Sequence, residues 1–259
     1  SRRLSLLAEG PGRRRLPGAA RAAMRCRIAG VGLLGPGLPG WDASRAVLTG
    51  EAPWEPGPVP LPPPAALPAT ERRRTSASVR LALVASAEAV AASGLPARAL
   101  ETVFASSNGD GAVVGAILEA LSGGDGAISP TQFHNSVHNA AAGYWGIAAG
   151  SMRASVSLGG HDDSFPSGLL QAVAAVVARG VPVLFCAYDA PLPPPLDAHR
   201  PTGAPFAAAL VLVPEGHGTG TPLTVEFLEA AEYFYRNYQD ESLYATAVRY
   251  LANGVKPCA

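Results

Sequence analysis

The stretch that decides the fold runs from Ser129 to Val177: SPTQFHNSVHNAAAGYWGIAAGSMRASVSLGGHDDSFPSGLLQAVAAVV. Its patterning predicts a helix over 138–150, a short buried strand over 153–158 and an apolar helix over 164–178. Between the strand and the last helix lies the turn GGHDD, at 159–163. Sharp turns at the carboxyl ends of strands are where α/β proteins place their chemistry, so this turn is the first candidate site.

The rest of the chain alternates strands with helices. Strands are expected over 25–31, 101–107, 181–188 and 207–213, helices over 76–93 and 112–121, and a hairpin partner of the last strand over 223–227. The run VPVLFCAY is apolar throughout, as in a strand covered on both faces. The fold class is therefore α/β, with a sheet that carries helices on both faces.

Charge and cysteine content exclude several classes of function. Twenty Lys and Arg residues balance twenty Asp and Glu residues, which argues against nucleic acid or an anionic membrane as the main partner. With 48% hydrophobic and only 15% charged residues, the chain is a good candidate for burying surface against another subunit. Its three widely spaced cysteines suit neither a disulfide framework nor a metal site, and favour the cytoplasm. No apolar run is long enough to span a bilayer.

The two ends differ from the middle. Residues 1–23 are rich in arginine and lack the apolar segment of a secretory signal, so we expect a disordered extension, with a mitochondrial-type presequence as the alternative. The proline run within 51–69 predicts an extended surface loop. Residues 228–259 are aromatic and mixed, and their pattern indicates no role.

Two long motifs together resemble the amino-terminal half of a β-ketoacyl synthase, a family with the thiolase fold. They are FHNSVHNAAAGYWGIAAG and SVSLGGHDDSFPSGLLQA; RCRIAGVGLLGP and ALVLVP further resemble the family's first strand and the strand that closes its first half. The resemblance implies a thiolase-like half, a mixed sheet in a layered αβα arrangement, over a domain at 24–227.

The resemblance also implies a missing nucleophile. In the family, a cysteine at the elbow before the second helix is held as a thiolate near the helix amino terminus and accepts an acyl group. The matching position here is Asp162, which cannot form a stable thioester. Cys26 and Cys186 fall inside strands and are expected to be packing residues. Asp162 or Asp163 is then expected to cap the helix that starts at Ser164.

A second family motif occurs at an unexpected place. The segment EGHGTGTP, at 215–222, matches the family's EAHGTGTP segment, which carries one of two catalytic histidines. In the family that segment lies in the second half, whereas here it follows ALVLVP directly. Two interpretations stay open for His217: a Gly/Thr hairpin turn between the last two strands, or a retained catalytic histidine.

The remaining histidines do not predict a metal site. His134 and His138 have an i, i+4 spacing, and His161 lies beside Asp162, but Pro130 indicates that His134 precedes the helix. Hydrogen bonding at an interface or cavity is the favoured role. The turn NGDG, at 108–111, lacks the spacing and the lysine of a phosphate loop. We therefore expect no metal, no cofactor and no catalytic residue.

The group that the chain resembles most is the chain-length-factor type of aryl polyene and related type II polyketide clusters. That resemblance implies a non-catalytic subunit that forms a heterodimer with a complete β-ketoacyl synthase, meets an acyl carrier protein transiently and shapes the acyl tunnel. The residues implied at the interface or tunnel lie before and within the first helix, in the strand and in the turn: Phe133, His134, Asn135, Tyr144, Ser155, Val156, Ser157, Leu158 and His161. The alternatives are a diverged acyltransferase or malonyl decarboxylase that uses His217 or Asp162, and a purely structural paralogue.

Overall fold

A computed structural model describes residues 23–123 and 126–226. Six strands form one sheet: β1 (Ala23–Leu34), β2 (Glu101–Ala105), β3 (Ser155–Leu158), β4 (Val183–Asp189), β5 (Phe206–Pro214) and β6 (Thr221–Glu226). The helices are α1 (Trp41–Leu48), α2 (Ala69–Arg74), α3 (Ala77–Ser93), α4 (Gly111–Ser122), α5 (Pro130–Asn135), α6 (Ala140–Ala149) and α7 (Ser164–Arg179). The predicted extension at 1–23 and the segment at 228–259 lie outside the described residues, except for Ala23.

The strands follow the order β3-β2-β4-β5-β1-β6. β3, β2 and β4 are parallel, whereas β5 is antiparallel to both β4 and β1, and β6 is antiparallel to β1. The sheet is therefore mixed, as predicted. β5 is antiparallel to β4, so the start of β5 lies beside the carboxyl ends of β2, β3 and β4. The end of β5 therefore lies beside the amino ends of these strands.

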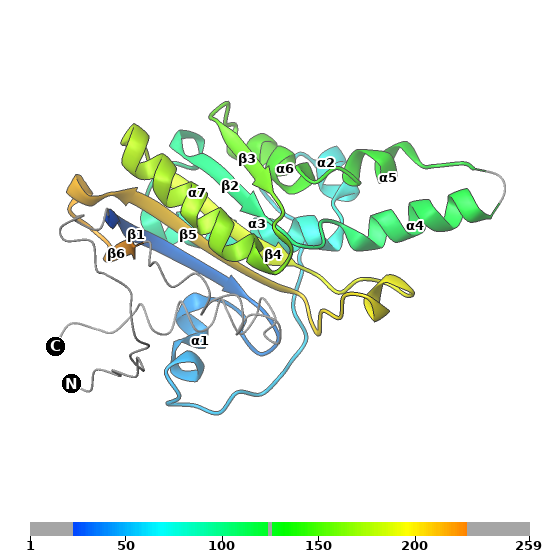
Figure 1. Ribbon diagram of the computed structural model, residues 1–259, viewed down its shortest axis with the longest axis horizontal. Coiled ribbons are helices and arrows are strands. Elements are labelled where there is room, and N and C mark those ends of the chain that lie inside the picture. Colours follow the sequence, from blue (N-terminus) through cyan, green and yellow to red (C-terminus); the bar gives the residue numbers. More distant parts are fainter. Residues whose placement is uncertain (1–22, 124–125, 227–259) are drawn as a thin grey trace, which may run out of the picture.

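Helices cover both faces of the sheet. α7 lies across the front of the sheet in Figure 1 and α3 lies behind it. Two apolar clusters follow from this arrangement, one between the sheet, α3 and α6, and the other between the sheet, α7 and α1. Every residue of β4 is buried, which agrees with its uninterrupted apolar sequence. The layered αβα arrangement and the thiolase-like fold class are confirmed.

Local signals explain where α3 begins and ends. Ser76 accepts a hydrogen bond from the backbone N–H of Val79 at 3.2 Å, which satisfies one of the free donors of the first turn. Gly94 ends the helix with φ of 68°, a left-handed conformation that favours glycine. The predicted helix over 76–93 thus agrees with the structure to within one residue.

Three expectations about secondary structure were wrong. β6 does not form a hairpin with β5; it pairs with β1, which lies between them, so that Ala23 faces Glu226. The helix expected from His138 begins at Ala140, and a separate short helix, α5, precedes it. The strand expected to be buried over 153–158 is the edge strand β3, with Ser155 exposed and the rest half-buried.

Candidate functional site

The turn between β3 and α7 is a tight elbow. A short 3₁₀ turn, His161–Asp163, follows the two glycines, and His161 has a φ of 54°, which is uncommon for a residue with a Cβ. Ser164 secures this backbone: its hydroxyl accepts from the Gly160 N–H at 3.0 Å and donates to the His161 carbonyl at 2.6 Å. The predicted strand–turn–helix is therefore present, and His161 is the residue with unusual backbone geometry.

Arg200 closes the turn from a distant loop. Its guanidinium donates to Asp162 Oδ1 at 2.8 Å and contacts His161 Nε2 at 2.6 Å. Because arginine can only donate, His161 Nε2 must accept, which assigns the proton of the neutral ring to Nδ1. Nδ1 lies 3.3 Å from Asp162 Oδ2, so the Asp162 carboxylate contacts both Arg200 and His161. The expected helix-capping role of the aspartates is not observed, because the cap residue Asp163 makes no side-chain capping bond and Asp162 binds Arg200 instead.

A buried carboxylate anchors the other side of the same cluster. Asp189, at the end of β4, accepts from the Ser106 hydroxyl at 2.7 Å and from the backbone N–H groups of Ser107 and Asn108 at 3.0 and 2.8 Å. Burial raises the pKa of Asp189, although these hydrogen bonds oppose the rise. Asn108 then accepts from Arg200 Nε at 2.8 Å. One network thus joins the carboxyl ends of β2, β3 and β4.

The network contains no activated nucleophile. The Asp162 carboxylate is paired with a cation, and the Ser164 hydroxyl is engaged by backbone groups of its own turn. Burial raises the pKa of Cys26 to about 11 and that of Cys186 to about 12, so both thiols stay protonated at neutral pH. Within residues 23–123 and 126–226, no three His, Cys, Asp or Glu side chains gather where they could hold a metal ion.

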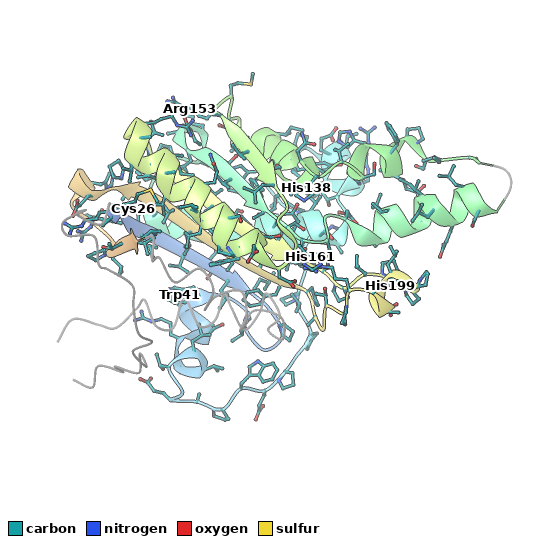
Figure 2. The ribbon with its side chains drawn as sticks, viewed as in Figure 1. Cys26, Trp41, His138, Arg153, His161 and His199 are labelled. Atoms are coloured by element: carbon teal, nitrogen blue, oxygen red, sulfur yellow. The ribbon has the colours of Figure 1, made fainter. Side chains whose placement is uncertain are left out.

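His217 lies at the other end of the sheet. It belongs to a short 3₁₀ turn after β5, where its Nδ1 is 3.2 Å from the Thr219 hydroxyl, and Pro214 before it pairs with Cys26. Figure 2 shows Cys26 and His161 at opposite ends of the sheet. From the register, roughly 20 Å of strand separates the two sites. His217 and Asp162 therefore cannot act on the same atom. The hairpin-turn interpretation of the 215–222 segment was also wrong, because the segment crosses over β1.

The residues expected at the acyl tunnel occupy two layers around α5. Phe133 is 67% exposed, and the exposed His134 ring meets Tyr144 edge-on with ring centroids 5.7 Å apart. Tyr144 is buried, and its hydroxyl donates to Asn135 Oδ1 at 3.0 Å, while Asn135 Nδ2 donates to the Arg74 carbonyl at 2.8 Å. Phe133 and His134 are therefore accessible, whereas Tyr144 and Asn135 hold α5 in place from behind. His134 lies on α5, whereas His138 lies between α5 and α6. The Nε2 atom of His138 is 3.0 Å from the Ser106 carbonyl, so this side chain is directed to the end of β2.

β3 presents an open edge. The carbonyls of Ala154 and Leu158 accept from Thr102 and Ser106 of the β2 side at 3.0 and 3.1 Å. By strand alternation, the backbone groups of Ser155 and Ser157 turn away from β2. Val156 and Leu158 pack toward the α7 side, while Ser155 and Ser157 line a groove beside α6. An edge strand of this kind is a template for a further strand.

The helical hairpin of α4 and α5 was missed as a functional surface. It projects away from the sheet in Figure 1. The α4 sequence GAVVGAILEALS has one charged residue, yet only Gly111 is buried, and Leu118 and Leu121 are about half exposed. A helix that is apolar all round is normally buried, so this composition could have indicated a covered surface from the sequence alone. Phe133 on α5 and Val137 after it are exposed large apolar side chains as well.

The chain belongs to the β-ketoacyl synthase family, because the model of that family's N-terminal domain matches residues 46–253. The ketosynthase ApeO in complex with its chain length factor ApeC from Xenorhabdus doucetiae is similar in structure, with a TM-score of 0.62 and 26% identity over 73% of this chain and 79% of that chain. No curated protein matched the sequence. In the part of the chain that the structure describes, no helix is long and apolar enough to cross a membrane.

Two further structures are similar in fold. A β-ketoacyl synthase from Burkholderia phymatum STM815 gives a TM-score of 0.58 at 19% identity, over 75% of this chain and 60% of that chain. The ishigamide ketosynthase/chain length factor gives 0.58 at 16% identity, over 75% and 59%. The chain thus spans between 59% and 60% of the length of these two proteins.

Proposed function

We propose that the chain is a non-catalytic ketosynthase-like subunit of the chain-length-factor type. It pairs with a complete β-ketoacyl synthase in the cytoplasm and shapes the tunnel in which that enzyme extends an acyl chain held by an acyl carrier protein, in aryl polyene or related polyketide biosynthesis. In this proposal residues 24–227 form the ketosynthase-like domain. The observation that carries it is the Asp162 carboxylate at the elbow, 2.8 Å from Arg200.

The chemistry of the elbow supports a role without covalent catalysis. A carboxylate paired with a guanidinium is a poor nucleophile, and any acyl group on it would be a mixed anhydride exposed to hydrolysis. Arg200 also contacts His161, so the nearest imidazole faces a permanent cation. A general base needs a free nitrogen within reach of the proton it removes, and this ring has none directed at a hydroxyl or thiol of the described residues.

The open edge of β3 supports pairing with another subunit. Ser155 and Ser157 carry the outward backbone groups of a strand that is hydrogen-bonded on one side, by β2. The exposed side chains of Ile147 and Met152 flank this edge. Adding a partner's strand would satisfy the backbone groups and cover apolar surface in one step.

Phe133 and His134 are the residues through which the chain would set acyl length. Both are exposed on α5, next to the apolar surface of α4, and the His134 ring packs edge-on against buried Tyr144. A phenyl ring at the floor of a tunnel stops a growing chain by steric exclusion. Phe133→Ala should therefore lengthen the product made by the complex, with Val177→Ala on α7 as a matched exposed apolar control.

Co-expression with a cysteine-containing β-ketoacyl synthase tests the pairing. We expect the two chains to co-purify, and Ser155→Pro to prevent this, because proline removes an outward N–H and blocks an approaching strand. Proline is tolerated on an edge strand when its nitrogen faces away from the neighbour, so circular dichroism of Ser155→Pro should match that of the parent chain. A chain that never co-purifies with such an enzyme would refute the proposal.

The same co-expressed proteins and variants distinguish two other possible functions of the chain. A diverged malonyl decarboxylase would release carbon dioxide from malonyl carrier protein without a partner, and His217→Ala or Asp162→Asn would abolish the release. A purely structural paralogue would co-purify with the enzyme, yet Phe133→Ala would leave product length unchanged. We expect neither result.

A further inference from the structure

A pocket of about 350 Å³ lies against β1, between α1, α3 and the start of β6. Its walls include Val31, Trp41, Glu88 and Ala92. Figure 2 shows Trp41 below β1, at the side of the molecule away from Arg153 and β3. The pocket shares no residue with the elbow network or with the residues expected at the acyl tunnel.

The floor of this pocket is an unpaired edge of β1. The pairing of β6 with β1 runs from Ala23 to Ile28 and ends there. Further along β1, the N–H of Leu33 points away from β5 and donates to Glu88 Oε2 at 2.9 Å. By strand alternation the N–H and the carbonyl of Val31 point the same way, and within the described residues no hydrogen bond reaches either group. These two groups can exchange both hydrogen bonds with one further residue in antiparallel orientation.

The free stretch of β1 is short and closed at both ends. Glu88 occupies the position beside Leu33, and Gly220 packs so closely against the Ile28 carbonyl that a Cβ at Gly220 would overlap it. At about 3.3 Å of strand per residue, roughly two residues fit between these points. A volume of about 350 Å³ is also near the lower end of the range for small-molecule pockets. These dimensions favour a free molecule of dipeptide size over a strand of another protein.

Carboxylates at one end of the pocket determine which way such a molecule lies. A residue paired antiparallel to β1 at this place has its amino end toward Leu33, where the Glu88 carboxylate lies. Glu88 accepts one N–H on each oxygen, from Leu33 at 2.9 Å and from Trp41 at 2.6 Å, so each oxygen keeps a free lone pair. Asp42 follows Trp41, lines the same pocket and has no ion-pair partner in the described part of the chain. Two carboxylates against the single guanidinium of Arg45 favour a cation at this end.

The two faces of the sheet set the side chains that the pocket accepts. Directly opposed residues of an antiparallel pair place their side chains on the same face. Val31 and Trp41 both pack against the apolar cluster on the α1 side, so a residue opposite Val31 would have an apolar wall beside it. The α3 face leaves little room, because a Cβ at Gly30 would overlap the Ala89 carbonyl. The residue before it, whose side chain points to that face, must therefore be small.

We propose that this pocket binds a free dipeptide or dipeptide amide with an α-ammonium group, a small first residue and an apolar second residue. The ammonium lies at the Glu88 and Asp42 end, and the N–H and carbonyl of the second residue pair with the carbonyl and N–H of Val31. The site goes beyond the proposed function, which makes no use of it.

Isothermal titration calorimetry of the full chain with glycyl-leucine amide tests the site. N-acetylation of this probe removes the ammonium, and N-methylation of its leucine removes the N–H that the Val31 carbonyl would accept. Each change should raise the dissociation constant at least roughly tenfold. No heat of binding at about 10 mM probe, or equal binding of all three molecules, overturns the proposal.

Two pairs of variants locate the binding. Ala92→Leu fills the pocket from α3 and should abolish binding, whereas Ala91→Leu, at the neighbouring exposed residue outside the pocket, should leave the dissociation constant unchanged. Asp42→Asn should weaken binding of the probe roughly tenfold but not that of its N-acetyl form, and Asp197→Asn is the matched exposed control. Melting temperatures check that each variant is folded.

The outcomes separate this site from the subunit role. Binding that survives both Ala92→Leu and Asp42→Asn would place the peptide elsewhere and overturn the proposal. Failure of the chain to co-purify with a ketosynthase would overturn the proposed function alone, because the titrations need no partner.

Discussion

Replacing Arg200 with methionine should destabilise the chain by about 2 kcal/mol. The guanidinium makes three contacts, to Asn108 Oδ1, to Asp162 Oδ1 and to His161 Nε2. Its side chain is 22% exposed and that of Asp162 is 45% exposed, so solvent screens the ion pair to about 0.5 kcal/mol. The half-buried bond to Asn108 and the acceptor that it would leave unpaired contribute about 1.5 kcal/mol. Methionine retains an apolar stem of similar length.

Urea and thermal denaturation, followed by circular dichroism, measure this loss. About 2 kcal/mol corresponds to a fall in melting temperature of roughly 4–8 °C for a domain of this size. Asp162→Asn removes the ion pair alone and should lower stability by about 0.5 kcal/mol. Added salt at 1 M should reduce the effect of Asp162→Asn and leave most of the effect of Arg200→Met, since screening acts on exposed charges.

Two results would refute this account of the elbow. Equal losses for Arg200→Met and Asp162→Asn would mean that the ion pair carries the whole effect and that Asn108 gains nothing from the guanidinium. A neutral Arg200→Met would mean that the network does not hold the turn in solution. In the second case the elbow would be more open to chemistry than its hydrogen bonds indicate.

Other substitutions and probes give further predictions. Gly168→Ala on α7 should cost about 1–3 kcal/mol in unfolding experiments, because the new methyl would come within 2.6 Å of an aromatic carbon of β4, whereas Gly143→Ala on α6 meets nothing within 4 Å and should stabilise by about 0.5–1 kcal/mol. Under native conditions at pH 8, mass-spectrometric mapping should find Cys26 and Cys186 unalkylated, since a thiol with a pKa of about 11 is only about one-thousandth ionised there. The raised pKa of Asp189 means that the folded chain binds this proton more tightly than the unfolded chain. Relative to Asp189→Asn, the parent should therefore gain stability as pH falls through that raised pKa toward the ordinary aspartate pKa of 3.8, and an opposite slope in urea titrations would contradict burial as the dominant cause.

The elements with local signals were the ones that the sequence predicted well. Ser76 and Gly94 bracket α3 because a serine cap and a left-handed glycine act within a few residues of the helix. α5 carries a comparable signal that was overlooked: Gln132 Oε1 accepts from the Ser129 N–H at 3.3 Å, three residues away. The partner of β6 was beyond such reasoning, because β1 lies about 200 residues earlier and no local pattern distinguishes it from β5 as a neighbour.

The candidate site divides in the same way. The elbow and the aspartate within it follow from a contiguous stretch, so both could be found in the sequence. Arg200 could not be found, since it lies 38 residues after Asp162 in a proline-rich loop without periodicity, and only the meeting of the strand ends brings it to the turn. The distance between His217 and Asp162 was likewise hidden, because it depends on β5 running against β4.

The pairing of Ala23 with Glu226 has a practical meaning for anyone handling the protein. The chain enters the sheet and leaves it at neighbouring positions on the β6 side, while β3 forms the far boundary. A short peptide could therefore join these two points, and new termini could be opened in the 51–68 loop, giving a circularly permuted version of the same body. Affinity tags fused directly at Ala23 or Glu226 would also stand a whole sheet width from β3, so immobilised bait could still offer that boundary to its enzyme.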